Sequence, residues 1–307
     1  MSKQITFIDL FAGIGGFHIA LHNVGAKCVF ASEIDRFSRE TYIANFKSIS
    51  PDLFNKNYFA GDIRNINPFD IPNFDILCAG FPCQPFSQAG YKKGFQDELQ
   101  NRGNMFFEIL KIINIKKPNV IFLENVRHLK KHDEGRTFNI IKKHIESQGY
   151  SFHYKVVKAS DHGLPQHRPR LFIVGFLKEK FANISFDFPE PEPLVSSMSD
   201  IFNGQCMKKI GYTLRVGGRS SGIDDRRNWD TYLVDNKIIR LSVEHAKKMQ
   251  GFPRNFIFPV SETQAMKQLG NSVAIPAIEA TARKIVTYIQ TIKNQQIGQI
   301  NNYEQIF

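Results

Sequence analysis

The sequence is poor in cysteine and tryptophan. Its 307 residues include one tryptophan and four cysteines, and no two cysteines form a C-x-x-C pair; the cysteines are Cys28, Cys78, Cys83 and Cys206. This scarcity excludes a disulfide framework and argues against a cysteine-based zinc site. We therefore expect the fold to depend on a packed core.

Long apolar runs are also absent. No stretch approaches the roughly 18 uninterrupted apolar residues of a membrane-spanning helix. The first residues show no charged start followed by an apolar run and a cleavage site. We therefore expect a soluble, cytoplasmic protein. With 42% hydrophobic residues it can bury a substantial core, and its length fits one large and one small domain.

Acidic residues are outnumbered by basic ones. The chain has 40 Lys and Arg against 29 Asp and Glu, which gives a formal net charge of +11 and a pI near 9.4. This balance suits a polyanionic partner such as nucleic acid, although a solvated basic surface would give the same total. Charge therefore supports a nucleic-acid partner only together with other features.

The first part of the chain alternates short apolar runs with helical periodicity. The apolar runs predict strands at 5–11, 28–32, 75–79, 120–124, 154–159 and 171–176. Between them, apolar residues recur at three and four positions and predict helices at 17–24, 105–115 and 137–147. This alternation predicts a doubly wound α/β fold with a mostly parallel sheet covered on both faces.

A second unit follows a proline-rich segment. Three prolines within 187–193 predict a linker. Residues 194–260 then hold eleven Lys or Arg against six Asp or Glu, together with six glycines, which predicts a small, basic, loop-rich domain. An amphipathic helix at 275–289 is expected to pack back on the first unit. The predicted division is therefore a large domain of residues 1–193 completed by 265–307, and a small domain with its hinge at 194–264.

A glycine-rich turn follows the first predicted strand. The segment 11–16 reads FAGIGG, and Glu33 follows the second strand about 20 residues later, where a carboxylate can accept hydrogen bonds from ribose. Glycines there let a nucleotide-like ligand approach the backbone. The pattern indicates a nucleoside-cofactor site. Because the spacing is G-x-G-G, a dehydrogenase and a purely structural turn remain alternatives at this point.

Cys83 differs from the other cysteines in its surroundings. It stands between two prolines at the end of a predicted strand, the edge at which open α/β sheets bind ligands. Cys28 and Cys78 lie inside predicted strands and are interpreted as small buried hydrophobes. Glu124 ends the next predicted strand and so shares the edge with Cys83. A thiolate and a carboxylic acid together suit attack on one atom of an electron-rich ring whose neighbouring nitrogen needs support.

Six short motifs occur in a fixed order along nearly the whole chain. They are Phe-x-Gly-x-Gly at 11–15, Pro-Cys-Gln at 82–84, Glu-Asn-Val at 124–126, Gln-x-Arg-x-Arg at 166–170, Gln-Gly-Phe-Pro at 250–253 and Gly-Asn-Ser-Val at 270–273. In this order they resemble the bacterial DNA (cytosine-5)-methyltransferases of restriction–modification systems. The resemblance implies a Rossmann-like methyltransferase fold that transfers a methyl group from S-adenosyl-L-methionine to carbon 5 of a flipped-out cytosine in duplex DNA.

The resemblance also implies the residues of the cofactor site. Phe11 would stack on the adenine, Glu33 would hold the ribose, and Pro82 would contribute its backbone. The complete set implied is Phe11, Gly13, Gly15, Glu33, Ile34, Asp62, Ile63, Pro82, Asn271 and Ser272.

The implied catalytic residues follow in the same way. Cys83 would be the nucleophile, Glu124 the acid at ring nitrogen 3, and Asn125 a scaffold for the active-site loop. Arg168 and Arg170 would steady the base and the nucleophile. Because a free thiol is only slightly ionised at neutral pH, a nearby cation such as Arg168 is expected to help. The segment 86–104 is expected to close over the flipped base.

Target choice is expected in the small domain, chiefly in 204–232. Thr213 and Leu214 resemble the Thr-Leu pair that the family places in its recognition region. Four arginines offer forked donors that read guanine or grip phosphate. The residues predicted to contact DNA are Gln84, Ser87, Thr213, Arg215, Arg219, Arg226 and Arg227. The expected partner is double-stranded DNA with a short target site, bound by a monomer, and a companion restriction endonuclease would act on the same site.

Two other functions share this scaffold. A tRNA cytosine-5 methyltransferase usually lacks a recognition module between the Arg-x-Arg and Gln-Gly-Phe-Pro segments, whereas this chain has a long segment there. A non-catalytic DNA-binding regulator would have no need of Cys83 and Glu124. His128 and His132 have the spacing of metal ligands, but no third ligand fits, so no metal is expected. Trp229 is expected to anchor the core of the small domain.

Overall fold

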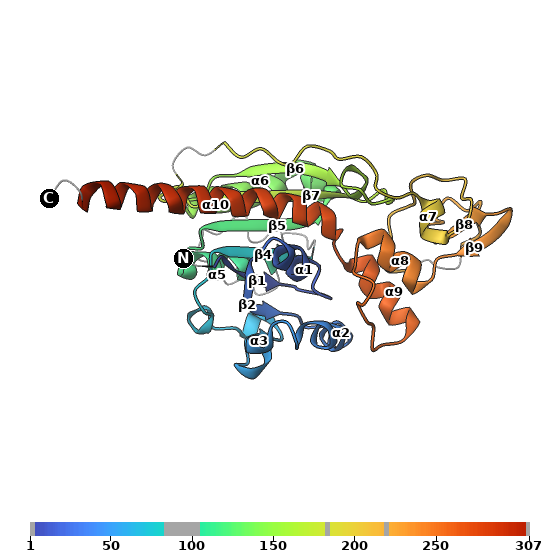
Figure 1. Cartoon of the computed structure of the whole chain (residues 1–307), viewed down its shortest axis with the longest axis horizontal. Coiled ribbons are helices and arrows are strands. Elements are labelled where there is room, and N and C mark those ends of the chain that lie inside the picture. The colour runs from blue at the N-terminus through green and yellow to red at the C-terminus, as the bar shows by residue number, and fades with distance from the viewer. Residues whose placement is uncertain (1–3, 83–104, 182–184, 218–220, 305–307) are drawn as a thin grey trace.

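A seven-stranded sheet forms the centre of the computed structural model, which describes residues 4–82, 105–181, 185–217 and 221–304 (Figure 1). The strand order is β3-β2-β1-β4-β5-β7-β6, and only β7 runs antiparallel to its neighbours. The strands are β1 (Thr6–Leu10), β2 (Lys27–Ser32), β3 (Phe59–Ala60), β4 (Ile76–Gly80), β5 (Val120–Val126), β6 (His153–Lys158) and β7 (Pro169–Phe176). The predicted doubly wound, mostly parallel α/β fold is confirmed.

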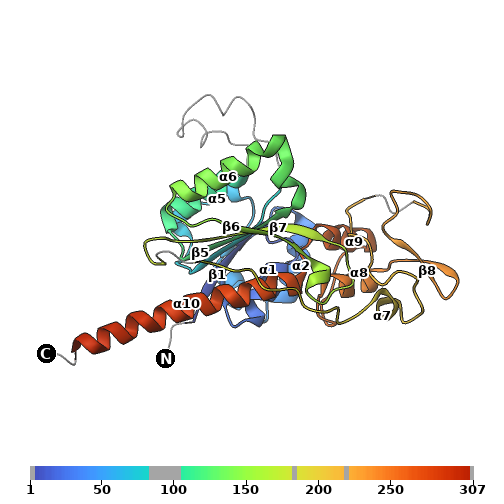
Figure 2. The same ribbon diagram turned by 90° about the horizontal axis from the view of Figure 1, so that it is seen from above.

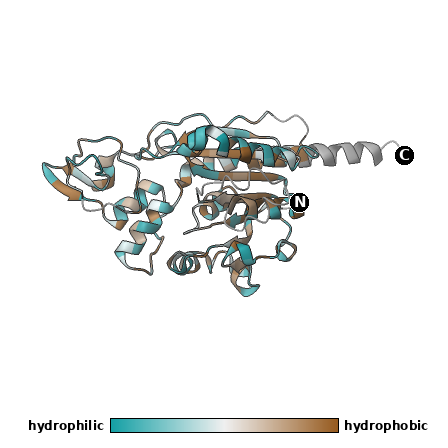
Figure 3. Ribbon diagram, turned by 180° about the vertical axis from the view of Figure 1, so that it is seen from behind, coloured by the Kyte–Doolittle hydropathy of each residue, from teal (hydrophilic) through white to brown (hydrophobic). Residues whose placement is uncertain are grey.

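Helices cover both faces of this sheet (Figure 2). One face is covered by α1 (Gly16–Asn23) and α10 (Ile275–Glu304), and the other by α5 (Met105–Lys116) and α6 (Arg136–Ser147). Side chains alternate along a strand, so Phe7 of β1 enters the first layer and Ile8 and Leu10 enter the second. Burial on both faces explains why the central strands read as continuous apolar runs. Figure 3 shows the same concentration of apolar residues in the central strands.

Short elements connect the sheet to its surroundings. Beside β2 and β3 lie α2 (Arg36–Phe46) and α3 (Pro51–Asn55), and short 3-10 helices follow several strands. The 3-10 helices are η1 (Ile63–Asn65), η2 (Pro68–Asp70), η4 (Arg127–Gly135) and η5 (Ala159–Asp161). Neither α2 nor β3 was predicted, because the apolar periodicity of α2 is weak and the two residues of β3 show no alternation. The predicted end of the last helix at 289 is wrong, since α10 continues through a polar stretch to Glu304.

A small sheet lies beside the large one (Figure 1). It consists of β8 (Thr231–Val234) and β9 (Lys237–Arg240), with α7 (Met198–Phe202), α8 (Val243–Gln250) and α9 (Glu262–Asn271) nearby. Trp229 is 1% exposed, and its Nε1 donates to the carbonyl of Gly217 at 2.9 Å, so its predicted place in a core is confirmed. No helix among the described residues combines the length and apolar content of a membrane span.

A buried polar cluster joins α1 to α2 and α3. His18 is fully buried; its Nδ1 lies 2.6 Å from the hydroxyl of Tyr42, and its Nε2 lies 3.1 Å from Oγ of Ser50. The imidazole also stacks on the ring of Phe46, with centroids 4.1 Å apart. Burial lowers the pKa of His18 to about 3, so the folded protein holds the ring neutral.

This cluster makes stability dependent on pH. In the unfolded chain His18 has a pKa of about 6.5 and becomes protonated below that pH, whereas in the folded protein it stays neutral. The free energy of unfolding therefore falls as the pH falls below about 6.5. Between pH 7 and pH 5 we expect the wild type to lose about 2 kcal/mol more stability than His18→Gln. Urea unfolding at both pH values measures this difference. His167→Gln, which changes an exposed histidine, serves as the control. An identical pH dependence in the wild type and His18→Gln would contradict the interpretation.

Candidate active site

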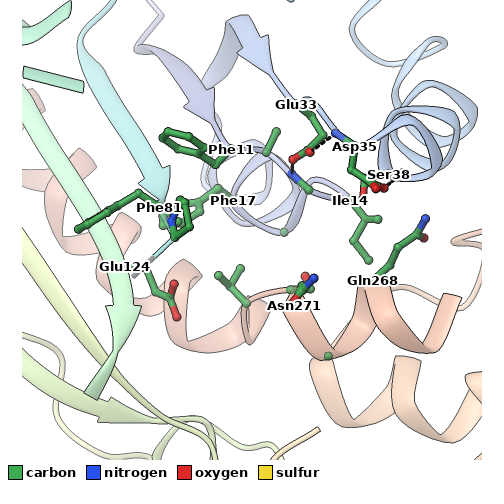
Figure 4. Close-up of a pocket in the computed structure, with 18 of the residues that line it drawn as sticks. Phe11, Ile14, Phe17, Glu33, Asp35, Ser38, Phe81, Glu124, Gln268 and Asn271 are labelled. Atoms are coloured by element: carbon green, nitrogen blue, oxygen red, sulfur yellow. Dashed lines mark hydrogen bonds between the residues drawn. The ribbon is translucent and has the colours of Figure 1, made fainter. Parts of the chain in front are cut away.

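A pocket of about 460 Å³ opens where β1, β2, β4 and β5 reach their carboxyl ends. Parallel strands bring these ends to one edge of the sheet, which is where open α/β folds bind ligands. One face of α9 closes the pocket from the opposite side. Figure 4 shows Phe11 and Glu33 on one side of the space, Asn271 on the other and Glu124 at the end of β5. Segments distant in sequence therefore meet in one space.

The turn after β1 shapes one end of the pocket. Gly13 and Gly15 have φ of 55° and 83°, values that glycine adopts without strain. A side chain on Gly15 would also collide with the ring of Phe46, since its Cβ would lie 2.2 Å from a ring carbon. Gly13 and Phe11 line the pocket, whereas Gly15 does not. Gly15 thus determines the conformation of the turn but does not itself line the pocket.

Glu33 is held in place by backbone amides. Its Oε2 accepts a hydrogen bond from Gly13 N at 2.7 Å, and its Oε1 accepts one from Asp35 N at 2.7 Å. Each carboxylate oxygen keeps further lone-pair capacity, so the group can still accept hydroxyl donors. Burial raises the pKa of Glu33, while the two amides oppose that shift. The neighbouring Ile34 is exposed and also lines the pocket.

Asp62 and Ile63 lie after β3 and are not among the residues that line the pocket. Asp62 caps η1, and its carboxylate accepts hydrogen bonds from the backbone and the side chain of Arg64. These bonds lower the pKa of Asp62. Ile63 is buried in the core on the α5 side of the sheet. Their assignment to an adenine edge stays a prediction.

The other end of the pocket holds a buried ion pair. Glu124 is 8% exposed, and its Oε1 lies 2.9 Å from Nε of Arg170, a residue of β7 that pairs with the end of β5. Burial raises the pKa of Glu124, although the charges of Arg170 and Arg168 oppose the shift. A carboxyl with a raised pKa keeps its proton to higher pH than a free carboxyl, which suits a proton donor. The pair therefore suits an acid that is steadied by a cation.

Asn125 binds the backbone directly after the neighbouring strand β4. Its Nδ2 donates to the carbonyl of Phe81 at 2.9 Å, and its Oδ1 accepts from Val126 N at 2.8 Å. Pro82 follows Phe81, is exposed, and lines the pocket. Asn125 thus fixes the chain two residues before position 83. Cys83, Gln84, Ser87 and the segment 86–104 lie outside the described residues.

Arg168 has a different environment from Arg170. It is 2% exposed, and its guanidinium donates to the carbonyls of Leu214, Gly270 and Ser272. Arg170 lines the pocket, whereas Arg168 does not. The described contacts of Arg168 are thus to backbone, and they give no support to direct contact with a base or a thiol. Burial lowers the pKa of Arg168, with the charge of Arg170 acting in the same direction.

One face of α9 was missed by the sequence analysis. Gln264, Lys267, Gln268 and Asn271 all line the pocket, and their spacing of three and four residues places them on one side of the helix. Only Asn271 and the following Ser272, which also lines the pocket, were predicted. The apolar residues of α9, Ala265, Met266 and Leu269, lie in the core and do not mark its polar face as part of a site. The Gly-Asn-Ser-Val motif at its end was the available signal.

Four of the residues predicted to contact DNA are described, and they lie outside helices and strands: Thr213, Arg215, Arg226 and Arg227. Thr213 Oγ1 donates to the carbonyl of His167, so its hydroxyl is already engaged. Arg215 and Arg226 are exposed, while Arg227 pairs with Asp225 at 2.8 Å. Arg219 lies outside the described residues. Within the described ranges, no group of three His, Cys, Asp or Glu side chains could hold a metal ion.

Known proteins resemble this chain along most of its length. The model of the C-5 cytosine-specific DNA methylase family matches residues 5–215 and 207–287. The Type II methyltransferase M.DsaV of Dactylococcopsis salina is 38% identical over 325 residues, which cover 96% of this chain and 89% of the relative. M.SsoII of Shigella sonnei is 41% identical over 317 residues (92% and 80%), and M.HhaI of Haemophilus parahaemolyticus is 36% identical over 326 residues (92% and 95%).

Solved structures with low sequence identity share the fold. A Spodoptera frugiperda DNMT2 mutant superposes with a TM-score of 0.67 at 16% identity, covering 92% of this chain and all of the other. The Entamoeba histolytica methyltransferase EhMeth gives 0.67 at 18% identity, with 94% and 99% covered. At such identities the likeness concerns the fold alone. Together with the family match and relatives above 35% identity, these findings establish that the chain belongs to the C-5 cytosine-specific DNA methylase family.

Proposed function

We propose that this protein transfers a methyl group from S-adenosyl-L-methionine to carbon 5 of a flipped-out cytosine in duplex DNA, as the modification enzyme of a restriction–modification system. One observation carries the proposal. A single pocket joins a nucleoside-type site around Phe11 and Glu33 to the buried pair of Glu124 and Arg170. The relatives named Type II methyltransferases support the same activity.

The residues of the pocket fit S-adenosyl-L-methionine. Phe11 offers an aromatic ring to the adenine, and the amide-held carboxylate of Glu33 accepts the ribose hydroxyls. Its volume of about 460 Å³ lies within the usual range for small-molecule sites. Further proposed contacts at the lining are Gly13, Ile34, Pro82, Asn271 and Ser272. Gly15, Asp62 and Ile63, which do not line the pocket, complete the proposed set. When bound, the cofactor supplies a methyl group activated on a sulfonium.

The chain's own groups would activate the base. Base flipping removes the cytosine from the stack, because carbon 5 is inaccessible inside a duplex. The thiolate of Cys83 adds to carbon 6 while the proton of Glu124 supports ring nitrogen 3, which places electron density on carbon 5. Arg170 steadies Glu124 and the base. After methylation, loss of the carbon 5 proton and expulsion of the thiolate restore the aromatic ring.

We assign the two activities to two domains. Residues 1–193, completed by 265–307, would bind the cofactor and perform the chemistry, and residues 194–264 would recognise the target. Duplex DNA with a short specific site would be the partner of a monomer in the cytoplasm. A companion endonuclease would cut the same site when it is unmethylated.

The nucleophile can be trapped with a modified substrate. Methylation of plasmid DNA followed by sequencing of methylated cytosines identifies the target. With S-adenosyl-L-methionine present, a duplex with 5-fluorocytosine at that position should then form a covalent complex, because fluorine blocks the elimination that follows thiol addition and methyl transfer. Intact-mass analysis detects the adduct. Cys83→Ala should abolish the adduct, and Cys206→Ala should retain it. Methyl transfer that persists in Cys83→Ala, or occurs only on RNA, would refute the proposal.

Glu33 should contribute to cofactor affinity through its carboxylate. Glu33→Ala removes the acceptor for ribose hydroxyls, so binding of S-adenosyl-L-methionine should weaken on the order of 1 to 3 kcal/mol. Calorimetry measures the change. Glu40→Ala removes a carboxylate of α2 that pairs with Arg36, away from the pocket, and should bind normally. If both variants bound like the wild type, Glu33 would have only a structural role.

The four arginines predicted to contact DNA should affect DNA binding in one of two ways. Alanine in place of an arginine that reads a base should cost about 1 to 3 kcal/mol at one position of the site. Loss of a phosphate contact should weaken all sequences alike and lower the salt slope by about one unit. Binding titrations at several salt concentrations separate the patterns for Arg215, Arg219, Arg226 and Arg227. Lys142→Ala on α6 is the control, and wild-type behaviour of all four variants would place recognition elsewhere.

A further inference from the structure

Three buried polar side chains converge on the backbone of residue 214 and of residues 269–272. Gln166 and Gln250 are fully buried, and Arg168 is 2% exposed. Gln166 Nε2 donates to Oε1 of Gln250 at 3.1 Å and to the carbonyl of Met249 at 2.9 Å. We call Gln166, Arg168 and Gln250 the junction cluster. Gln166 and Arg168 lie between β6 and β7, and Gln250 is the last residue of α8.

The junction cluster binds both backbone polar groups of Leu214, which lies in residues 213–217, the recognition segment. Leu214 N donates to Oε1 of Gln166 at 3.1 Å, and Nη1 of Arg168 donates to the carbonyl of Leu214 at 3.2 Å. Leu214 itself is 2% exposed. Because a buried amide or carbonyl that loses its partner is costly, a shift of Leu214 without the cluster is unfavourable.

The same cluster holds the loop that lines the cofactor pocket. Nη2 of Arg168 donates to the carbonyls of Gly270, at 3.0 Å, and Ser272. Gln250 Nε2 donates to the carbonyl of Leu269 at 2.7 Å. Residues 270–273 all line the pocket. Thus one set of side chains fixes the proposed recognition segment and the cofactor loop together.

A direct backbone contact reinforces this link. A Cβ on Gly270 would lie 2.5 Å from the carbonyl oxygen of Arg215 and 3.0 Å from Val216 N, so the recognition segment passes directly over this glycine. Asn271, the next residue, faces the pocket in Figure 4. Because the two segments are close-packed, a movement of one displaces the other.

We propose that Gln166, Arg168 and Gln250 are positioning residues that couple target DNA at residues 213–217 to the cofactor at residues 270–273. The inference rests on the proposed function, which places these ligands at the two segments. DNA that engages the recognition segment shifts or stiffens residues 270–273 through the cluster and so strengthens cofactor binding. By linkage, the cofactor strengthens binding of target DNA by the same factor.

A binding cycle measures this coupling directly. The dissociation constant of S-adenosylhomocysteine is measured by calorimetry alone and with the target duplex identified by methylation sequencing. The dissociation constant of the duplex is measured with and without S-adenosylhomocysteine. For the wild type we expect both ratios to agree and to be at least about fivefold. A non-target duplex should leave cofactor affinity within about twofold of its value without DNA.

The variants remove the polar links with little change in volume. Gln166→Met and Gln250→Met should reduce the coupling ratio to within about twofold of one. Asn228→Ala is the matched control, because Asn228 is a buried amide whose described donor bonds go to the carbonyls of Ile223 and Thr231 rather than to residues 269–273. It should keep the wild-type ratio even if DNA affinity falls, since a change in affinity alone cancels in the ratio.

The possible results separate the coupling from the proposed function. Failure of the wild type to bind either ligand would refute the proposed function. Binding of both ligands with a ratio of one would refute the coupling alone, as would wild-type ratios in folded Met variants. If circular dichroism showed both Met variants to be unfolded, Thr213→Val would decide, because it removes only the bond from Thr213 to the carbonyl of His167. A reduced ratio in that variant supports the coupling, and an unchanged ratio overturns it.

Discussion

The buried guanidinium of Arg168 imposes the constraint on which the rest of the site depends. A charge removed from water must be compensated by hydrogen bonds, and Arg168 obtains them from the carbonyls of Leu214, Gly270 and Ser272. These partners lie 46, 102 and 104 positions away in the sequence. The last turn of α9 and the segment over it must therefore both be in place before the charge can be buried.

The two main carboxyl groups of the pocket have different hydrogen-bond partners. Burial raises the pKa of both Glu33 and Glu124. Glu33 is compensated by two backbone amides, which favour the acceptor form that ribose hydroxyls need. Glu124 faces Arg170 at 2.9 Å, so its charge is balanced by a side chain that also lines the pocket. One end of the pocket is therefore built to accept hydrogen bonds, and the other can exchange a proton.

Sequence patterns predicted the large sheet and both carboxyl groups, but not the helix that closes the pocket. Buried parallel strands can be predicted because they occur as apolar runs in the sequence. The ends of these runs predicted Glu33 and Glu124 at one edge of the sheet. The polar face of α9 produces no such signal, so Gln264, Lys267 and Gln268 were missed. The environment of Arg168 could not be predicted either, because its acceptors are backbone carbonyls, which are present at every position of any sequence.

The junction also separates the loop proposed to contact DNA from the residues that line the pocket. The polar links to the cofactor loop use the backbone of Leu214 and of residues 269–272, so they do not depend on the side chains of the exposed loop at 221–227. That loop is secured separately: Asn228 donates to the carbonyl of Ile223, and the indole of Trp229 donates to the carbonyl of Gly217. Side chains such as Arg226 can then be exchanged without removing a buried partner from Gln166, Arg168 or Gln250. Recognition surfaces tolerate change where backbone, rather than side chains, carries the connection to the catalytic edge.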